Sequence, residues 1–237
     1  MSDPAGVIEQ VWRYPVKSLG GERVEESAAN ADGLAGDRVW AVQDEAGRLG
    51  SGKNSRRFTR IVGLLDLAAR YDDPAAPPVV TGPDGSVHPV ASGAADRLLT
   101  RISGRPVQVR RDTGILHFDE VPFSLVGTGT VDWLGREVPD VAVDARRLRP
   151  NLVVRTAEPF AEERWLDRTV RIGDQVTAVF DRVFTRCVMV GMAQPGLPES
   201  NDVLKSIGKR EDRPVCLAVG GRIVTPGVIR AGDPIWV

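Results

Sequence analysis

An arginine and a cysteine are adjacent late in the chain, at Arg186 and Cys187, directly after Thr185. A neighbouring cation favours the thiolate, which is the form of cysteine that attacks electrophiles and binds soft metals. The preceding run, residues 176–183, is typical of a strand, so we expect Cys187 where a strand gives way to a loop. A buried structural thiol is the more common role for a lone cysteine and stays open as the alternative.

Two other stretches carry groups that could hold an anion. Lys17 and Ser18 follow a predicted strand in a glycine-rich turn, where a cation, a hydroxyl and open backbone groups lie together. Pro150 restricts the residue before it, which predicts an extended Arg149 with an aimed side chain. Asn151 adds donors and an acceptor. An arginine with an asparagine suits a phosphate or the edge of a pterin, and a purely structural turn is the alternative.

Two further features have simpler interpretations. Cys216 lies in an apolar run, residues 215–219, which predicts a structural role in a core strand. A basic cluster lies within residues 51–60. It could be an ordinary solvated loop, or it could form the rim of a site and attract an anionic ligand or an acidic protein. The cluster consists of Lys53, Arg56, Arg57 and Arg60.

The composition limits the class of protein. The chain has 237 residues, with 42% hydrophobic and 27% charged residues, which predicts a packed globular core. Its formal net charge of −1 argues against a nucleic-acid or acidic-membrane partner. We find no apolar run long enough to span a bilayer and no signal peptide. With only two cysteines, a disulfide framework is not expected, and a cytoplasmic location fits.

Short strands separated by glycine and proline turns dominate the pattern. We expect strands at residues 7–14, 39–42, 65–71, 165–172 and 176–183, among others, and hairpins where turns such as residues 83–85 intervene. Only three short helices are expected, after Ser92, after Thr128 and over residues 201–207. This pattern predicts a mostly β, barrel-like fold with a few short helices.

Five motifs in this order resemble the MOSC proteins, which are named after the C-terminal domain of molybdenum cofactor sulfurase. They are YPVKS at residues 14–18, GDRVWAV at 36–42, LRPNLVV at 148–154, TRC at 185–187 and GDPIWV at 232–237. The resemblance is strongest to the branch with the mitochondrial amidoxime-reducing components and their bacterial relatives. It implies a MOSC N-terminal β-barrel region over residues 1–112 and a MOSC domain over residues 113–237, packed as one unit.

The resemblance also implies a molybdenum cofactor, in which a pyranopterin phosphate holds molybdenum and a cysteine thiolate ligates the metal. An association with pyridoxal phosphate is a further possibility that it leaves open. Cys187 would be the metal ligand and the catalytic position. The cofactor-binding positions would be Lys17, Ser18, Arg38, Arg149, Asn151 and Thr185.

The sequence departs from the resemblance in one loop, residues 119–123. Glu120 and Val121 stand where close relatives carry small hydroxyl residues, so this loop could contact a cofactor only through its backbone. We also expect no fused ferredoxin domain of the kind that some relatives carry and no membrane anchor, and the two cysteines are too few for an iron–sulfur cluster.

Three functions compete on this basis. The first is a molybdenum-dependent reductase of small N-hydroxylated compounds, such as amidoximes and hydroxylamines, that receives electrons from a separate ferredoxin- or flavodoxin-like protein. The second is a protein that binds or carries the molybdenum cofactor without turnover. The third is a β-barrel in which Cys187 is only a buried hydrophobe.

Overall fold

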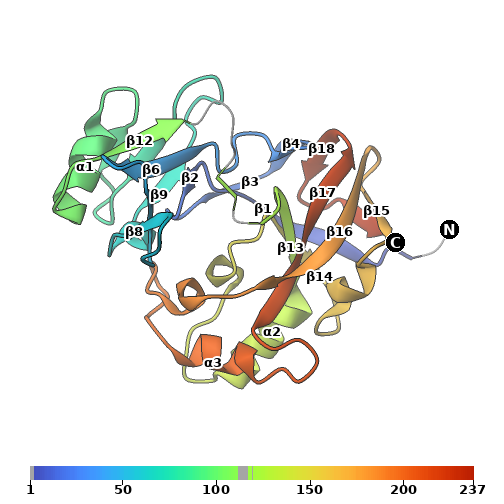
Figure 1. Ribbon diagram of the computed structural model, residues 1–237. Helices are drawn as coiled ribbons and strands as arrows, with labels where there is room; N and C mark the ends of the chain where they lie inside the picture. The colour runs from blue at the N-terminus through green and yellow to red at the C-terminus, as the bar shows by residue number, and fades with distance from the viewer. Residues whose placement is uncertain (1–2, 112–116, 119) are drawn as a thin grey trace.

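The computed structural model describes residues 3–111, 117–118 and 120–237. Its centre is a β-barrel of seven strands, which closes because the first and last strands of the path, β14 and β1, also pair with each other. Figure 1 shows the long strands β16 and β17 on its near side. In spatial order the barrel strands are β14 (Leu152–Arg155), β13 (Phe123–Gly127), β17 (Cys216–Thr225), β16 (Val176–Thr185), β15 (Thr169–Ile172), β19 (Pro234–Trp236) and β1 (Gly6–Arg13).

The barrel interior is filled by alternating apolar side chains of these strands. Phe123 and Phe180 stack at its centre with ring centroids 5.9 Å apart, and both are fully buried. The backbones of β17 and β16 approach closely at Gly221. A Cβ atom at this position would lie 2.0 Å from the carbonyl oxygen of Val179. A glycine is therefore required where the two strands bend around the core.

A half-barrel built from strands and a helix between residues 16 and 111 packs beside the barrel and has its own core, which includes Leu19, Val42 and Leu99. Its larger sheet runs β12-β6-β7-β8, with β2 paired to β6. Its strands are β2 (Val16–Lys17), β6 (Trp40–Asp44), β7 (Leu49–Ser51), β8 (Phe58–Arg60) and β12 (Val107–Arg111), with β9 (Ala68–Arg70), β10 (Val79–Thr81) and β11 (Val87–Pro89) in a second sheet and α1 (Ala94–Ser103) packed against them.

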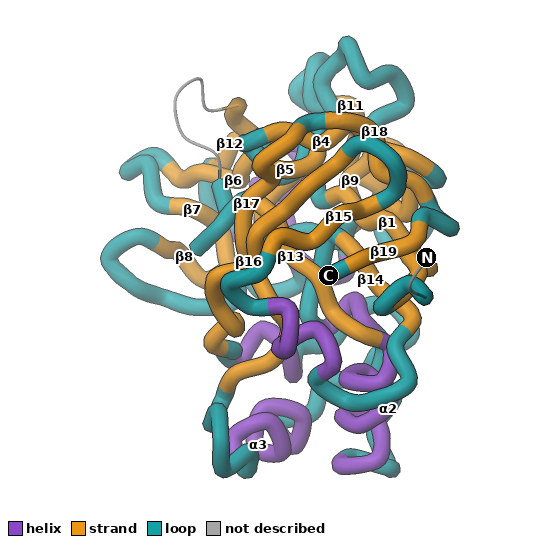
Figure 2. The backbone as a smooth tube through the Cα atoms, turned by 90° about the vertical axis from the view of Figure 1, so that its right-hand side faces the viewer, coloured by secondary structure: helices purple, strands orange, loops and turns teal. Residues whose placement is uncertain are grey.

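Short strands and helices complete the molecule. The strand β3 (Glu22–Val24) extends the barrel sheet from β1, and β18 (Gly227–Arg230), β4 (Glu26–Asn30) and β5 (Gly33–Leu34) form a small sheet. Figure 2 shows α2 and α3 together at the opposite end of the barrel from this sheet. The helices are α2 (Thr128–Glu137) and α3 (Asp202–Gly208), with 3₁₀ turns η1 (Leu64–Asp66), η2 (Ala145–Arg147), η3 (Ala161–Trp165) and η4 (Val188–Gly191). No helix in the described part of the chain is long and apolar enough to cross a membrane.

The mostly β, barrel-like fold expected from the sequence is confirmed. Four details differ. The N-caps of α1 and α2 are Gly93 and Gly127 rather than Ser92 and Thr128. The turn η1 occupies the start of the segment predicted as a strand at residues 65–71, and β15 begins at Thr169 because Trp165 ends η3. The expected boundary at residues 112 and 113 lies outside the described residues and stays a prediction. The strands β1 and β3, which precede this boundary in the sequence, lie in the same sheet as strands that follow it.

One buried carboxyl group in the barrel region gives a testable pH dependence. Glu162 is fully buried; its Oε2 accepts a hydrogen bond from Thr130 Oγ1 at 2.9 Å, and its Oε1 has no partner among the described residues. Burial raises the pKa of this carboxyl group above its usual range. A raised folded-state pKa means that the wild-type protein loses stability as the pH rises from the unfolded-state pKa toward the folded-state pKa.

We therefore predict that Glu162→Gln unfolds in urea with a higher free energy than wild type at pH 8. The advantage should be about 1 kcal/mol or more at pH 8 and should shrink toward pH 5, since glutamine has no charge to desolvate. The exposed Glu137→Gln is the control and should follow wild type at both pH values. An advantage for Glu162→Gln that is independent of pH would contradict the raised pKa of Glu162.

Candidate functional site

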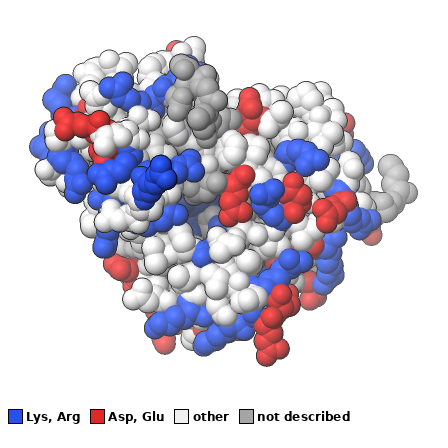
Figure 3. All heavy atoms as spheres, in the orientation of Figure 1, with Lys and Arg blue, Asp and Glu red and all other residues white. Residues whose placement is uncertain are grey.

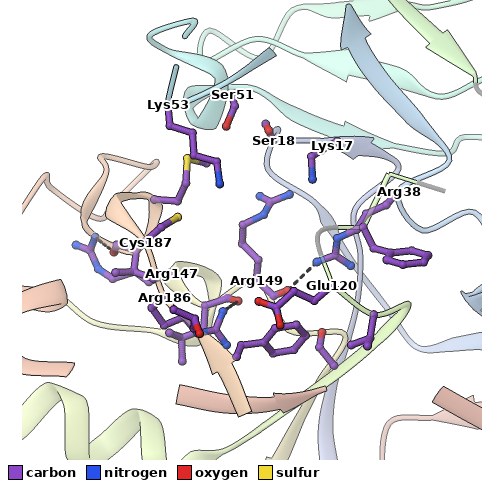
Figure 4. Close-up of a pocket in the computed structure, with 18 residues that line it drawn as sticks. Lys17, Ser18, Arg38, Ser51, Lys53, Glu120, Arg147, Arg149, Arg186 and Cys187 are labelled. Carbon is purple, nitrogen blue, oxygen red and sulfur yellow. Dashed lines mark hydrogen bonds between the residues drawn. The ribbon is translucent and has the colours of Figure 1, made fainter. Parts of the chain in front are cut away.

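A pocket lies between the barrel and the half-barrel (Figure 4). Six parts of the chain contribute its described lining residues: the end of β2, the turn before β6, the end of β7 with the loop that follows it, the start of β13 with the segment that leads into it, the turn before β14, and the end of β16 with the segment that follows it. Six of the seven residues predicted from the sequence line this pocket, namely Lys17, Ser18, Arg38, Arg149, Thr185 and Cys187; the other described lining residues are Ser51, Lys53, Phe118, Glu120, Val121, Ser124, Arg147, Leu148, Phe184, Arg186, Met189 and Val190.

The ring of Tyr14 supports two of the cations. The guanidinium carbons of Arg149 and Arg38 lie 4.3 and 4.9 Å from its centroid, within the range of cation–π attraction. Asp37 connects the same groups, since one carboxylate oxygen accepts from the Tyr14 backbone N–H at 2.7 Å and the other pairs with Arg38. Burial raises the pKa of the Tyr14 hydroxyl to about 12, although the two arginines act in the opposite direction. Tyr14 is therefore a neutral platform at physiological pH.

Arg149 has a left-handed backbone, with φ at 53°. The prediction that Pro150 holds it extended is wrong. Its N–H closes η2 by donating to the carbonyl oxygens of Ala145 and Arg146, both at 3.2 Å, and this turn requires the left-handed conformation. Its own carbonyl accepts from Arg38 Nη2 at 2.9 Å.

The side chain of Arg149 is nevertheless directed, because its Nη1 donates to the carbonyl oxygen of Leu19 at 2.6 Å. Ser18 and Arg38 share the left-handed backbone, with φ at 68° and 51°. Such strained residues cluster at functional sites, where the surrounding structure holds them.

Lys17 is buried on the half-barrel side of the pocket. Its ammonium group donates to the carbonyl oxygen of His117 at 2.9 Å and lies 5.6 Å from the ring centroid of Phe58. Its strand β2 pairs with β6, the strand that follows Arg38, so the half-barrel sheet fixes these two cations relative to each other. The barrel then contributes the third cation, Arg149, through the turn before β14.

Cys187 follows the end of β16, as predicted, and precedes η4. Its neighbour Arg186 turns inward and donates to the carbonyl oxygens of Leu217 at 2.7 Å and Leu148 at 3.1 Å. Burial lowers the pKa of Arg186 to about 10, with the Cys187 thiol acting in the opposite direction, so this residue stays charged at neutral pH. The effect of Arg186 on the Cys187 thiol stays a prediction.

Arg147, which the sequence did not single out, is buried behind the pocket. It donates to the carbonyl oxygens of Ala142, Val190 and Pro198 at 3.0, 3.2 and 2.7 Å. Burial lowers its pKa, and its bonds fix the segment that follows Cys187. Its position beside Arg149 in a predicted turn gave no signal of this role, because an arginine in a turn is normally solvated.

Asn151 is the one predicted site residue that does not line the pocket. It is fully buried, its Oδ1 accepts from the Ser124 backbone N–H at 3.1 Å and hydroxyl at 3.0 Å, and its Nδ2 donates to the carbonyl oxygen of Trp12 at 3.3 Å. These bonds join β1, β13 and β14 behind Arg149. Thr185 lies on the rim, with its hydroxyl 3.9 Å from the Cys216 sulfur.

The pocket is strongly basic. Its described lining has six cationic side chains and one carboxylate, Glu120. Figure 3 shows that Lys and Arg atoms gather on the half-barrel side and reach into a hollow of the surface. Fixed cations beside a hydroxyl can hold a phosphate, and a thiol on the same pocket can ligate a soft metal. Lys53, placed in a surface cluster from the sequence, and Ser51 are part of this lining.

Comparisons with known proteins agree with this architecture. The chain is 22% identical to the mitochondrial amidoxime-reducing component 1 of Homo sapiens, over 98% of this chain and 83% of that protein, and 25% identical to the Mus musculus protein, over 98% and 82%. It is 27% identical to the molybdenum cofactor sulfurase of Anopheles gambiae, over 85% of this chain and 32% of that protein.

The YUAD protein from Bacillus subtilis has a similar fold, with a TM-score of 0.53 at 10% sequence identity, covering 97% of this chain and 93% of that one. Family models match in two places: the MOSC N-terminal beta barrel domain at residues 5–70 and the MOSC domain at residues 101–236. The second match covers more than half of the chain, and the strands that it includes build most of the barrel beside Cys187. The chain therefore belongs to the MOSC domain family.

Proposed function

We propose that this protein is a molybdenum cofactor-dependent reductase of N-hydroxylated compounds that receives its electrons from a separate redox protein. The observation that carries the proposal is the pocket itself, in which the thiol of Cys187 and the cations Lys17, Arg38 and Arg149 converge from distant parts of the chain. The similarity to amidoxime-reducing components over 98% of the chain supports the reaction class.

The residues of the pocket fit such a cofactor in type and placement. Arg38, Arg149 and Lys17 would hold its phosphate end with the Ser18 hydroxyl, since their positions are fixed by Tyr14, Leu19 and His117 before any ligand arrives. Cys187 would ligate the molybdenum, because a thiolate suits this metal. When bound, the cofactor would supply the metal that exchanges an oxygen atom and two electrons with the substrate.

The reaction balances as follows. An N-hydroxylated substrate, two electrons and two protons give the N–H product and one water, with cleavage of the N–O bond. The chain contributes orientation: Arg147 and Arg186 fix the segments on both sides of Cys187 through carbonyl oxygens, and Phe184 forms part of the wall. The protons come from solvent at the mouth. A carrier that holds the cofactor without turnover would use the same residues, and turnover of an amidoxime with an artificial reductant separates the two.

The metal ligand is tested by exchanging each cysteine in turn. We predict that Cys187→Ser, produced in a host that makes the cofactor, loses molybdenum roughly tenfold or more by elemental analysis and loses amidoxime reduction with it. Cys216→Ser is the matched control and should keep both. Cys216 begins β17 outside the described lining of the pocket, and its neighbours Leu217 and Ala218 are fully buried. A Cys187→Ser protein that folds and retains wild-type molybdenum would remove the basis of the proposal.

The platform is tested at Tyr14. Its hydroxyl is buried without a hydrogen-bond partner in the part of the chain that the structure describes, so Tyr14→Phe should keep the ring and cost no stability. Tyr14→Leu removes the face under Arg38 and Arg149, and should lower the cofactor content of folded protein along with a stability loss of about 2–4 kcal/mol. Cofactor content and thermal unfolding report the two effects separately. Equal cofactor content in both variants would show that the ring does not position the arginines.

The electron donor should dock on the basic cluster. Arg56 and Arg57 are exposed on the β7–β8 loop, and Arg60 is exposed at the end of β8. Lys53 on the same loop and Ser51 at the end of β7 line the pocket. An acidic ferredoxin- or flavodoxin-like protein steered to this loop would bring its redox group close to the pocket. This steering weakens with salt, since the Debye length is about 8 Å at physiological ionic strength.

We predict that the Arg56→Glu/Arg57→Glu double variant slows donor-driven turnover about tenfold or more at low salt. Turnover with a small chemical reductant should be unchanged. The control is Arg164→Glu/Arg168→Glu, which changes the net charge equally on an exposed part of the barrel outside the described lining of the pocket. A loss that is equal with both reductants would assign the loop to the cofactor site or the fold rather than to docking.

A further inference from the structure

The pocket contains one negatively charged side chain among its described lining residues, Glu120. It precedes β13 in the loop where the sequence departs from the MOSC resemblance. Its side chain is exposed to solvent at the mouth. Figure 4 shows it in the part of the pocket with Arg149 and Arg186, across from Ser51 and Lys53. Glu120 thus differs in charge from the other ionisable side chains of the described lining, and this difference would affect which ligands the pocket binds.

The neighbouring cations are already engaged by other groups. Arg38 pairs with Asp37, and Arg186 donates to the carbonyl oxygens of Leu217 and Leu148. Arg182, on the outer face, pairs with Asp181 at 2.8 Å. Glu120 makes no ion pair or hydrogen bond in the described chain, so its oxygens are open to solvent and to a ligand.

The negative charge of Glu120 nevertheless acts on the pKa of Arg186, the residue next to Cys187. Burial chiefly lowers the pKa of Arg186, and the Cys187 thiol and the Glu120 carboxylate oppose that effect. The pKa of Arg182 is raised mainly by its hydrogen bond to Asp181, with a smaller contribution from Glu120. The carboxylate thus lies within electrostatic reach of the residue adjacent to the thiol.

A bound phosphate changes the balance of charges that an entering molecule meets. Once Lys17, Arg38 and Arg149 hold the phosphate end of a cofactor, their charges are compensated, and Arg147 and Arg186 stay bonded to backbone carbonyl oxygens. Glu120 and Lys53 then face an entering molecule from opposite walls of the mouth. A cationic group that approaches along the Glu120 wall gains an ion pair without displacing any existing partner. An anionic group on the same wall is repelled.

We propose that Glu120 selects the substrate by charge, so that the protein prefers N-hydroxylated compounds which also carry a cationic group, such as an ammonium, amidinium or guanidinium. The inference rests on the proposed function for its reaction. It goes beyond that function by naming the substrate class and a residue that determines it. Glu120 binds the substrate away from the N–O bond, so it should act on KM rather than on kcat.

The test uses two amidoximes that differ only in charge: an aryl amidoxime with a para trimethylammonium group and its para tert-butyl isostere. The quaternary charge does not change with pH. We expect Glu120→Gln to lower kcat/KM for the cationic substrate roughly fivefold through KM, since a partly exposed ion pair is worth about that factor. The tert-butyl substrate should stay within about twofold. Glu158→Gln, an exposed carboxylate outside the described lining of the pocket, is the control and should change neither.

Two further readouts separate this inference from the proposed function. The molybdenum content of Glu120→Gln should equal that of wild type. Titration calorimetry with the two corresponding primary carboxamides, which are not N-hydroxylated and carry no charge on the amide, measures binding without turnover. Wild type should bind the trimethylammonium compound more tightly, with the difference lost in Glu120→Gln.

Equal losses for both amidoximes, or equal binding of both carboxamides by wild type, would overturn charge selection even in an active reductase. Wild type that binds neither carboxamide would overturn it as well. Wild type that reduces neither amidoxime but shows the Glu120-dependent binding difference would overturn the reductase and leave charge selection at this pocket standing.

Discussion

The pocket depends on two arginines that keep their positive charge because neutral groups hold them. Arg147 and Arg186 donate to backbone carbonyl oxygens. The Tyr14 ring carries the guanidinium groups of Arg149 and Arg38 on its face, and Arg38 also pairs with the carboxylate of Asp37. A carboxylate partner would satisfy a guanidinium equally well and would also cancel its charge. Carbonyl oxygens satisfy the donors of Arg147 and Arg186 while the positive charge of each side chain remains, and this charge contributes to the attraction of an anionic ligand.

Burying these arginines costs desolvation free energy and backbone strain, and the fold offsets both. Desolvating an arginine requires several well-placed acceptors, and these come from turns whose backbones are already fixed by neighbouring strands. Three non-glycine residues of the pocket, Ser18, Arg38 and Arg149, have left-handed backbones that cost about 1–3 kcal/mol each. The packing of the barrel against the half-barrel offsets this strain energy. The geometry of the site therefore depends on the stability of both parts.

The sequence predicted the barrel, most strands and six of the pocket residues, because each of these leaves a local signal. Alternating apolar residues reveal strands, and the family motifs identify Lys17, Arg38, Arg149 and Cys187. What could not be predicted depends on packing between distant segments. The left-handed Arg149 follows from η2 rather than from Pro150, and Asn151 faces inward because Ser124 and Trp12 provide its partners. The role of Arg147 arises only when carbonyl groups nearly fifty residues later surround it.

The barrel closes through strands from both ends of the sequence. The strand β1 pairs with β19, and the Ala5 N–H donates to the carbonyl oxygen of Ile235 at 2.7 Å. During synthesis, β3 is available to β1 at once and β14 later, but β1 must wait for nearly the whole chain before its last partner, β19, exists. The local hairpins of the half-barrel can form early. Until β19 emerges, β1 has an unpaired edge that can join another chain. The time between the synthesis of β1 and that of β19 is thus the interval in which this protein is most exposed to misassembly.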